Sequence, residues 1–148
     1  VFKYPIAFNL IPHIDSFTGS GYTKEEIKMV NETRKILHDD KIKLSATCVR
    51  VPVKSVHSMS VTFVTEKNVK PDDVRDLLRN SKGIKLIDEP DKNRYPMPVN
   101  AEGEFDCFAG RIRKDSAFRN GISMWISGDQ LLKGAALNAV QIAELLIK

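Results

Sequence analysis

The sequence has few cysteines and no long apolar run. Its two cysteines, Cys48 and Cys107, are too few for a disulfide-stabilised fold, and we interpret them as buried, reduced thiols. No stretch reaches the roughly 18 apolar residues of a membrane-spanning helix, and no basic region or cleavage site of a secretory signal is present at the start. We therefore expect a cytoplasmic protein. Because the chain begins with Val1 in a strand-like pattern, we also expect it to be part of a longer protein.

Common chemical motifs are missing as well. The patterns GxGxxG, GxxxxGK[ST] and GxSxG do not occur, which excludes a complete Rossmann fingerprint, a P-loop and a nucleophile elbow within this sequence. His13 and His38 have no metal-type residue at ligand spacing, so we predict no metal site. The net charge of +4 does not by itself indicate nucleic-acid binding and is equally compatible with an anionic small-molecule ligand.

What is present is typical of one globular domain. The 148 residues are 42% hydrophobic and 28% charged. We predict an α+β fold with a mixed, largely antiparallel sheet and helices on one face. Period-2 patterns and β-branched residues predict strands, the second and third of them paired, at 6–14, 43–53, 58–65, 84–87, 105–113 and 121–127. A capping box of Thr23 and Glu26 predicts a helix ending at Leu37, and Pro71 predicts a second helix over 72–80.

The last segment differs from the rest of the sequence. Residues 131–147 have the length of a helix and are apolar nearly all round, which indicates burial on more than one side. In a chain this short, that pattern predicts a neighbouring structure outside the chain. We therefore divide the sequence into a domain over 1–130 and a C-terminal helical segment over 131–148.

Four charged or titratable residues could carry chemistry. Glu25 and Lys28 lie three apart on one helix face near its N-terminus, where anions are favoured, although the same spacing fits a solvated ion pair. Arg50 stands within a predicted strand and needs an anionic partner, which could equally be a structural carboxylate. His57 is suited to proton transfer near neutral pH, but a single histidine is more often structural or simply exposed.

Three strings in order carry a resemblance to a known family. Residues 21–28 (GYTKEEIK), 46–53 (ATCVRVPV) with His57-Ser58, and 128–141 (GDQLLKGAALNAVQ) resemble aspartate β-semialdehyde dehydrogenases, and the resemblance covers nearly the whole chain. These enzymes join an NADP-binding Rossmann-type domain, which carries a nucleophilic cysteine, to a substrate-binding and dimerisation domain like the catalytic domain of glyceraldehyde-3-phosphate dehydrogenases. The resemblance implies that this chain is the second part.

The implied activity is that of the whole enzyme. The family uses NADPH to convert β-aspartyl phosphate to aspartate β-semialdehyde and phosphate, in the synthesis of lysine, diaminopimelate, threonine and methionine. The resemblance implies a homodimer without nucleic-acid or membrane partners, and an NADP that is bound mainly by the absent domain. On this view, residues 131–148 pack against that domain.

The resemblance also assigns roles to single positions. Glu25 matches the residue that holds the substrate ammonium, Lys28 the one that holds the phosphate, and Arg50 the one that binds the α-carboxylate. His57 matches the acid/base histidine. The positions near the cysteine and the nicotinamide are matched by Gln130 and Asn138.

One departure limits what the chain can do. Neither Cys48 nor Cys107 stands in the family's nucleophile string, so we expect the chain alone to be catalytically incomplete. Two alternatives remain open, a related acyl-phosphate reductase such as N-acetyl-glutamyl-phosphate reductase and a non-catalytic dimerisation or scaffold fragment. A nucleic-acid binder is a more distant third.

Overall fold

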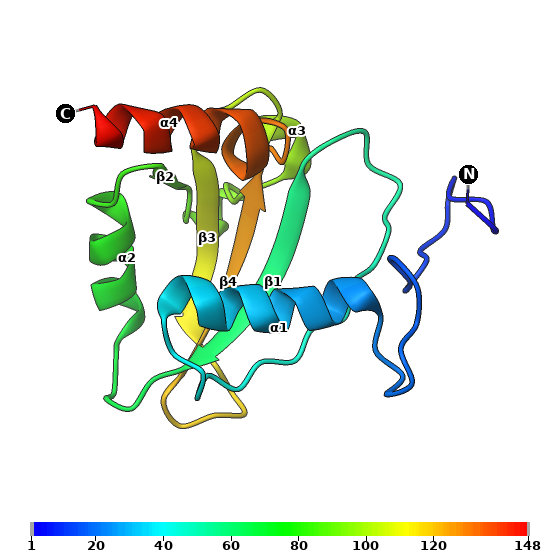
Figure 1. Ribbon diagram of the computed structural model, residues 1–148. Helices are drawn as coiled ribbons and strands as arrows, with labels where there is room; N and C mark the ends of the chain where they lie inside the picture. Colours follow the sequence, from blue (N-terminus) through cyan, green and yellow to red (C-terminus); the bar gives the residue numbers. More distant parts are fainter. Residues whose placement is uncertain (1, 148) are drawn as a thin grey trace. The chain divides into compact units, whose positions relative to one another are not determined.

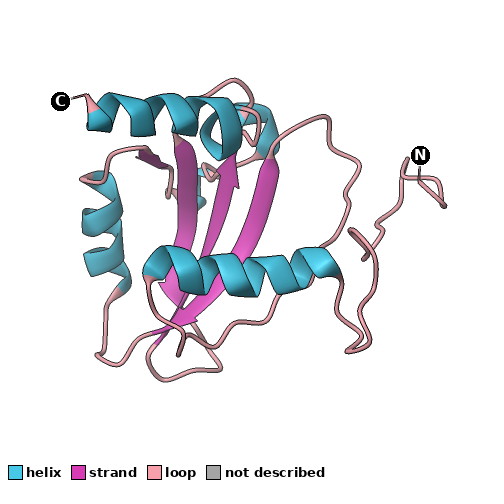
Figure 2. Cartoon of the chain, in the orientation of Figure 1, coloured by secondary structure: helices cyan, strands magenta, loops and turns pink. Residues whose placement is uncertain are grey.

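A computed structural model describes residues 2–147, and the chain divides into two compact units, Val1–Pro52 and Val53–Lys148. Val1 and Lys148, at the ends of the predicted ranges, lie outside the described residues. Figures 1 and 2 show the helices and strands of both units. Among the described residues, no helix is long and apolar enough to cross a membrane.

The first unit contains one helix, α1 (Lys24–Leu37), with the predicted capping box at its start. The Glu26 amide donates to the Thr23 hydroxyl at 3.3 Å, and the Glu26 carboxylate accepts from the Thr23 amide at 2.8 Å. At the other end, His38 takes a left-handed conformation with φ 53° and its amide bonds to carbonyls of the last turn. The predicted helix is therefore confirmed at both ends.

Two predicted strands of this unit are wrong. Within 6–14 and 43–53, ladder pairing is limited to one isolated bridge, in which Ile11 and Arg50 exchange two backbone hydrogen bonds of 3.0 and 2.8 Å. Residues 43–53 therefore do not pair with 58–65 as predicted. Alternating β-branched residues favour an extended backbone, but a ladder also needs a neighbouring strand, which a local pattern cannot supply.

The second unit is built on one four-stranded sheet. Its strands are β1 (His57–Val64), β2 (Ile84–Leu86), β3 (Cys107–Lys114) and β4 (Gly121–Gly128), in the order β1-β4-β3-β2. β4 is antiparallel to both β1 and β3, whereas β2 is parallel to β3. The predicted mixed, largely antiparallel sheet is confirmed.

Helices connect and flank these strands. The predicted helix at 72–80 is α2 (Pro71–Arg79), and the loop that follows β2 contains the short helices η1 (Pro90–Lys92) and α3 (Pro98–Ala101). The predicted C-terminal helix begins with a π-helical turn, η2 (Leu132–Ala136), and continues as α4 (Leu137–Leu146).

The two faces of the sheet have different cores. On one face, Val74 of α2 packs in a cluster with Ala109, Ile112, Ile122 and Met124. Phe108, adjacent to Ala109, points to the opposite face, where it packs with buried side chains including Ala101 of α3. The prediction of helices on one face thus holds for α2, while the one-turn α3 lies against the other face.

A β-bulge interrupts β3 between Gly110 and Arg113. Within it, Arg111 has φ 56°, and the Asp88 carboxylate accepts from the Arg111 amide at 2.7 Å and from the Ile112 amide at 3.3 Å. Asp88 also accepts from Arg75 Nε at 2.8 Å, and its side chain is only 2% exposed. This buried ion pair fixes the extra residue of the bulge.

Candidate functional site

Glu25 and Lys28 lie together on the first turns of α1. Lys28 Nζ and Glu25 Oε2 are 2.8 Å apart, and the two side chains are 51% and 31% exposed. The hydrogen bond that Lys28 donates to Glu25 raises the pKa of the lysine, so its amine stays protonated at neutral pH. The pair is thus the solvent-accessible intrahelical ion pair that the spacing predicted, and both groups can exchange partners with a ligand.

The neighbouring Glu26 has a second contact that the sequence did not reveal. Its Oε1 accepts from the Cys48 amide at 2.9 Å, while Oε2 completes the capping box, and the residue is buried. Backbone hydrogen bonds from Thr23 and Cys48 lower the pKa of this carboxyl. Glu26 therefore ties the turn that carries Glu25 to the segment that carries Arg50. A capping box uses only one carboxylate oxygen of its glutamate. When that glutamate is buried, its second oxygen needs another hydrogen-bond donor, and this requirement could have predicted the contact.

Arg50 is half-buried in the same unit. Its backbone is held by Ile11, and its guanidinium carbon lies 5.0 Å from the centre of the Phe2 ring. Among residues 2–147 it forms no ion pair with a carboxylate, so the structural salt bridge considered as its alternative role is absent there. An unpaired, half-buried guanidinium in a fixed backbone suits an incoming carboxylate.

His57 belongs to the second unit and is the first residue of β1. The residue before it, Val56, has φ 74°, an uncommon conformation for a β-branched side chain. Val56 is buried against Phe108 and Ala101, so packing holds the strained backbone in place. The exposed imidazole is therefore presented from a fixed position at the edge of the sheet.

Gln130 lies near this edge, because His57 pairs with Gly128 at the end of β4. The Gln130 Oε1 atom is buried and has no hydrogen-bond donor among the described residues. Asn138 differs, since its Oδ1 accepts from Lys133 Nζ at 3.1 Å, and the same ammonium donates to Gln141 at 2.6 Å. Of the two predicted cofactor-binding residues, Gln130 alone has an orphaned acceptor.

Asp129 holds the turn that carries Gln130. Its carboxylate accepts from the amides of Gly103 at 2.9 Å, Leu131 at 2.8 Å and Leu132 at 3.3 Å. These bonds, the one from Gly103 foremost, lower the pKa of Asp129. Asp129 has no predicted role, and the aspartate three residues before the start of η2 is the local signal that could have found these bonds to the amides of Leu131 and Leu132.

The pKa values of the two cysteines are raised rather than lowered. Both are half-buried rather than fully buried. Burial raises the pKa of Cys48 and of Cys107, and at Cys48 the Glu26 carboxylate raises it further. At neutral pH both groups are thiols, whereas nucleophilic catalysis needs a thiolate.

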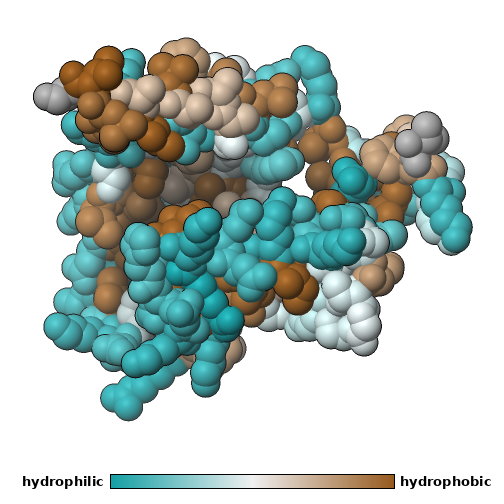
Figure 3. All heavy atoms as spheres, viewed as in Figure 1, coloured by the Kyte–Doolittle hydropathy of each residue, from teal (hydrophilic) through white to brown (hydrophobic). Residues whose placement is uncertain are grey.

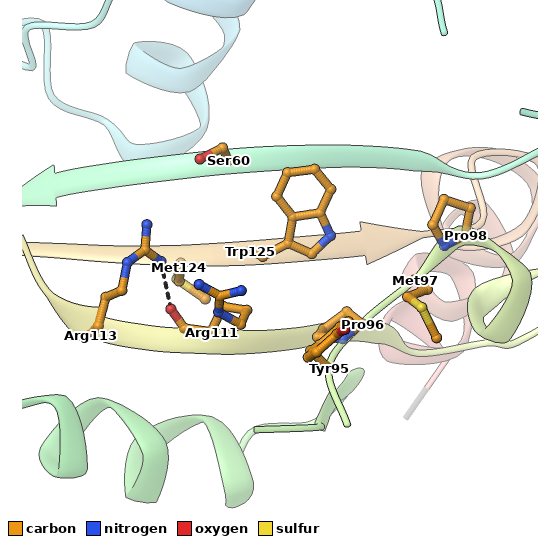
Figure 4. Close-up of a pocket in the computed structure, with 9 residues that line it drawn as sticks. All are labelled: Ser60, Tyr95, Pro96, Met97, Pro98, Arg111, Arg113, Met124 and Trp125. Atoms are coloured by element: carbon orange, nitrogen blue, oxygen red, sulfur yellow. Dashed lines mark hydrogen bonds between the residues drawn. The ribbon is translucent and has the colours of Figure 1, made fainter. Parts of the chain in front are cut away.

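A separate pocket lies on the sheet face that α2 does not cover (Figure 4). It has a volume of about 330 Å³ and contains the bulge residues Arg111 and Arg113 beside Trp125. Arg113 donates to the Arg111 carbonyl at 2.8 Å, and neither guanidinium pairs with a carboxylate among residues 2–147. The remaining lining residues are Ser60, Tyr95, Pro96, Met97, Pro98 and Met124. None of the six predicted site residues lines this pocket.

Comparisons with known proteins give one consistent result. Residues 1–133 match the family model described as semialdehyde dehydrogenase, dimerisation domain. Aspartate-semialdehyde dehydrogenases of Aquifex aeolicus and Bacillus subtilis are 57% and 49% identical over 147 and 146 residues. These alignments cover 99% and 98% of this chain but 43% and 42% of the relatives, so the chain spans less than half of their length.

Solved structures agree. Aspartate semialdehyde dehydrogenase II of Vibrio cholerae, complexed with ASA, is 45% identical with a TM-score of 0.94, over 99% of this chain and 43% of that one. The Candida albicans enzyme, solved with NADP, is 26% identical with a TM-score of 0.75, over 95% and 45%. The family match over most of the chain, together with these two neighbours, establishes that the chain belongs to the semialdehyde dehydrogenases and corresponds to their dimerisation domain.

Proposed function

We propose that the chain is the substrate-binding and dimerisation part of an aspartate-semialdehyde dehydrogenase. The observation that carries this proposal is the 57% identity to the Aquifex aeolicus enzyme over 147 residues. The reaction is the NADPH-dependent conversion of β-aspartyl phosphate to aspartate β-semialdehyde and phosphate. Its place in lysine, diaminopimelate, threonine and methionine synthesis, and a cytoplasmic location, form part of the same proposal.

The first unit binds the substrate. β-Aspartyl phosphate carries an ammonium, a carboxylate and a phosphate, and this unit offers one carboxylate and two cations. Glu25 binds the ammonium, Lys28 the phosphate, and Arg50 the α-carboxylate in bidentate fashion. The 2.8 Å pair of Glu25 and Lys28 then separates as each group takes its substrate partner. Because the pair is solvent-exposed, breaking it costs little, a few tenths of a kcal/mol.

His57 manages protons at the reacting carbon. The nucleophilic thiol comes from outside this chain, since neither Cys48 nor Cys107 stands in the family's nucleophile string and burial raises the pKa of both thiols. His57 accepts the proton of that thiol and returns one as the aldehyde is released. The packed, strained Val56 keeps the imidazole at one place during both transfers.

The nicotinamide cofactor would meet this chain at Gln130. NADP supplies hydride chemistry when it is bound. The buried Oε1 of Gln130 needs an N–H donor, which a carboxamide provides, so this residue fits the group. Asn138 fits less well, because its oxygen is already bonded to Lys133. Asn138 either donates a hydrogen bond to the cofactor from its NH₂ group or only holds Lys133 in place.

The C-terminal segment 131–148 packs against the nucleotide-binding part of the enzyme. Several apolar residues of α4 are exposed in this chain, with Val140 and Ile142 both more than half exposed. Figure 3 shows apolar atoms gathered along this helix. Exposed apolar surface of this kind is typical of an interface. On this assignment, residues 1–130 form the substrate and dimerisation domain proper.

The second copy of the homodimer packs on the sheet face around the Figure 4 pocket. Along β1 this face exposes Ser60 and Thr62, and within the second unit α2 packs against the opposite face. Trp125 and the two unpaired arginines of the bulge are an aromatic anchor and hydrogen-bond donors of the kind that interfaces favour. Thr62→Arg should convert the dimer to monomer in analytical ultracentrifugation, whereas Asn31→Arg, on the exposed side of α1, should leave it dimeric.

The reaction is tested in a chimera in which this chain replaces the matching 43% of the Aquifex aeolicus enzyme. We expect turnover of β-aspartyl phosphate. Arg50→Lys should lower kcat/KM about 10- to 100-fold, which corresponds to the loss of one or two charged hydrogen bonds. Glu25→Gln should raise KM, because the substrate ammonium loses its counter-ion.

Other outcomes would contradict the proposal. A chimera that folds but is inactive would favour the scaffold role. Preference for N-acetyl-glutamyl phosphate would favour the related reductase, since an acylated amine has no charge for Glu25 to bind. Unchanged kinetics in the Arg50 and Glu25 variants would remove these residues from the site.

A further inference from the structure

Residues 43–53 have the burial pattern of a strand without belonging to a ladder. Side chains at even positions are half-buried and those at odd positions are exposed, over Ile42, Lys43, Leu44, Ser45, Ala46, Thr47, Cys48, Val49, Arg50 and Val51. Strict alternation of this kind requires an extended backbone. At the end of the run, Val49, Val51 and Val53 form an apolar stripe that is 38%, 45% and 45% exposed.

The backbone hydrogen bonds lie along one edge only. The Cys48 amide bonds to Glu26, and the Arg50 amide and carbonyl both bond to Ile11. In an extended chain, backbone groups of alternate residues point to the same edge, so these bonds all lie on the even-numbered edge, at Cys48 and Arg50. On the odd-numbered edge, Ser45, Thr47, Val49 and Val51 form no backbone hydrogen bond with any of residues 2–147.

An edge of this kind is a template for another strand. Extended, β-branched segments with unpaired amides and carbonyls readily accept a partner strand. The exposed valine stripe of the same segment would also be stabilised by burial. Unbonded backbone groups and exposed apolar side chains thus occur together in one stretch of chain. A pairing that satisfied the backbone alone would leave the apolar stripe in water.

We propose that Lys43–Val53 is a β-strand that is completed by a strand from the part of the enzyme this chain does not span. The chain covers 43% of its Aquifex aeolicus relative, so more than half of such an enzyme remains to supply both the strand and the cover for the valines. A second copy of this chain fits less well. Two copies paired antiparallel at this edge would place their valine stripes side by side on one uncovered face.

The proposed strand has a direct consequence for Arg50. In this chain the arginine backbone is fixed from one side by a single bridge to Ile11. Pairing of Val49 and Val51 would fix it from the other side as well, and would thereby hold the guanidinium at a constant place. The inference rests on the backbone and on the family, and it does not depend on which acyl phosphate the enzyme reduces.

Amide hydrogen exchange tests the pairing directly. It is measured by NMR or fragment mass spectrometry on this chain alone and on the Aquifex aeolicus chimera. In the chimera, the amides of Thr47, Val49 and Val51 should exchange at least about 100-fold more slowly than in the chain alone. The amides of Cys48 and Arg50 have partners already and serve as internal controls that are protected in both proteins.

Two results would overturn the proposal. One is fast exchange of the odd-numbered amides in a folded chimera, which would leave the edge unpaired. The other is protection of the same amides in the chain alone that grows with its concentration, because the partner would then be a second copy. Activity is not read in this experiment, so its failure is distinguishable from failure of the proposed reaction.

A pair of proline variants gives a second reading. Val49→Pro removes an amide that is unbonded in this chain, so it should lower the melting temperature of the chimera by several degrees more than that of the chain alone. Arg50→Pro removes an amide that bonds to Ile11, and it should destabilise both proteins. An equal loss for Val49→Pro in both proteins would contradict the proposed strand.

Discussion

Removal of the Asp88 carboxylate should destabilise the second unit far more than an ordinary surface substitution. The carboxylate is 2% exposed, and it accepts from Arg75 at 2.8 Å and from two bulge amides at 2.7 and 3.3 Å. Asp88→Ala leaves the half-buried guanidinium and two amides without this acceptor. Removing one partner of a buried ion pair costs about 3 to 5 kcal/mol. We expect about 3 kcal/mol, because Arg75 keeps its second pair with Asp72.

The same arginine provides a matched control. Asp72 also lies 2.8 Å from Arg75, but its side chain is 83% exposed. Asp72→Ala should therefore cost no more than about 1 kcal/mol, as surface ion pairs do. Asp88→Asn keeps one acceptor oxygen and should fall between the two variants.

The assay is urea unfolding of the 148-residue chain, followed by circular dichroism. An unchanged slope with a lower midpoint would show that stability itself has changed. In thermal unfolding, 3 kcal/mol corresponds to roughly 6 to 12 °C. The reasoning would be refuted if Asp88→Ala and Asp72→Ala had equal costs. Because the same carboxylate fixes the bulge that presents Arg111 and Arg113, Asp88→Ala should also weaken the dimer.

Three further predictions concern stability. Thr23→Ala removes the hydroxyl that caps α1 and should cost about 1 kcal/mol in urea unfolding, while Thr23→Ser should be nearly neutral. The folded-state pKa of Asp129 lies below its ordinary value of 3.8, so its stabilising contribution is complete above that pH and is lost as the pH falls through the folded pKa. Asp129→Asn should accordingly flatten the decline in stability below pH 4, and an unchanged pH profile would exclude this role. Gly110→Ala would drive a methyl group into the Ile87 carbonyl oxygen and should cost about 3 kcal/mol; a stable, well-folded variant would show that the approach is looser.

Local sequence signals predicted the helices and most of the sheet. The capping box at Thr23 and the proline at position 71 gave helix starts that the structure reproduces within one residue. Such signals work because helix ends satisfy their own backbone groups within a few residues of the chain. Strands over 84–87, 105–113 and 121–127 were also found, with ends shifted by up to two residues.

Pairing was not predictable in the same way. The pattern of 43–53 is that of a strand, yet it joins no ladder here, and β1 pairs with β4, which is distant in sequence. Which strands become neighbours depends on the packing of the whole sheet, and a single segment does not contain that information. The bulge at Arg111 and the conformation of Val56 are further results of this packing.

The sequence by itself determined the family and predicted roles for Glu25, Lys28, Arg50 and His57, because motif strings depend on residue type and spacing alone. The tertiary structure decided which groups are satisfied and which are not. It showed that Glu26 bonds to Cys48 and that the Gln130 oxygen has no hydrogen-bond donor within residues 2–147. Hydrogen-bond satisfaction and burial depend on contacts between residues far apart in the chain, so they are established only when the chain is folded.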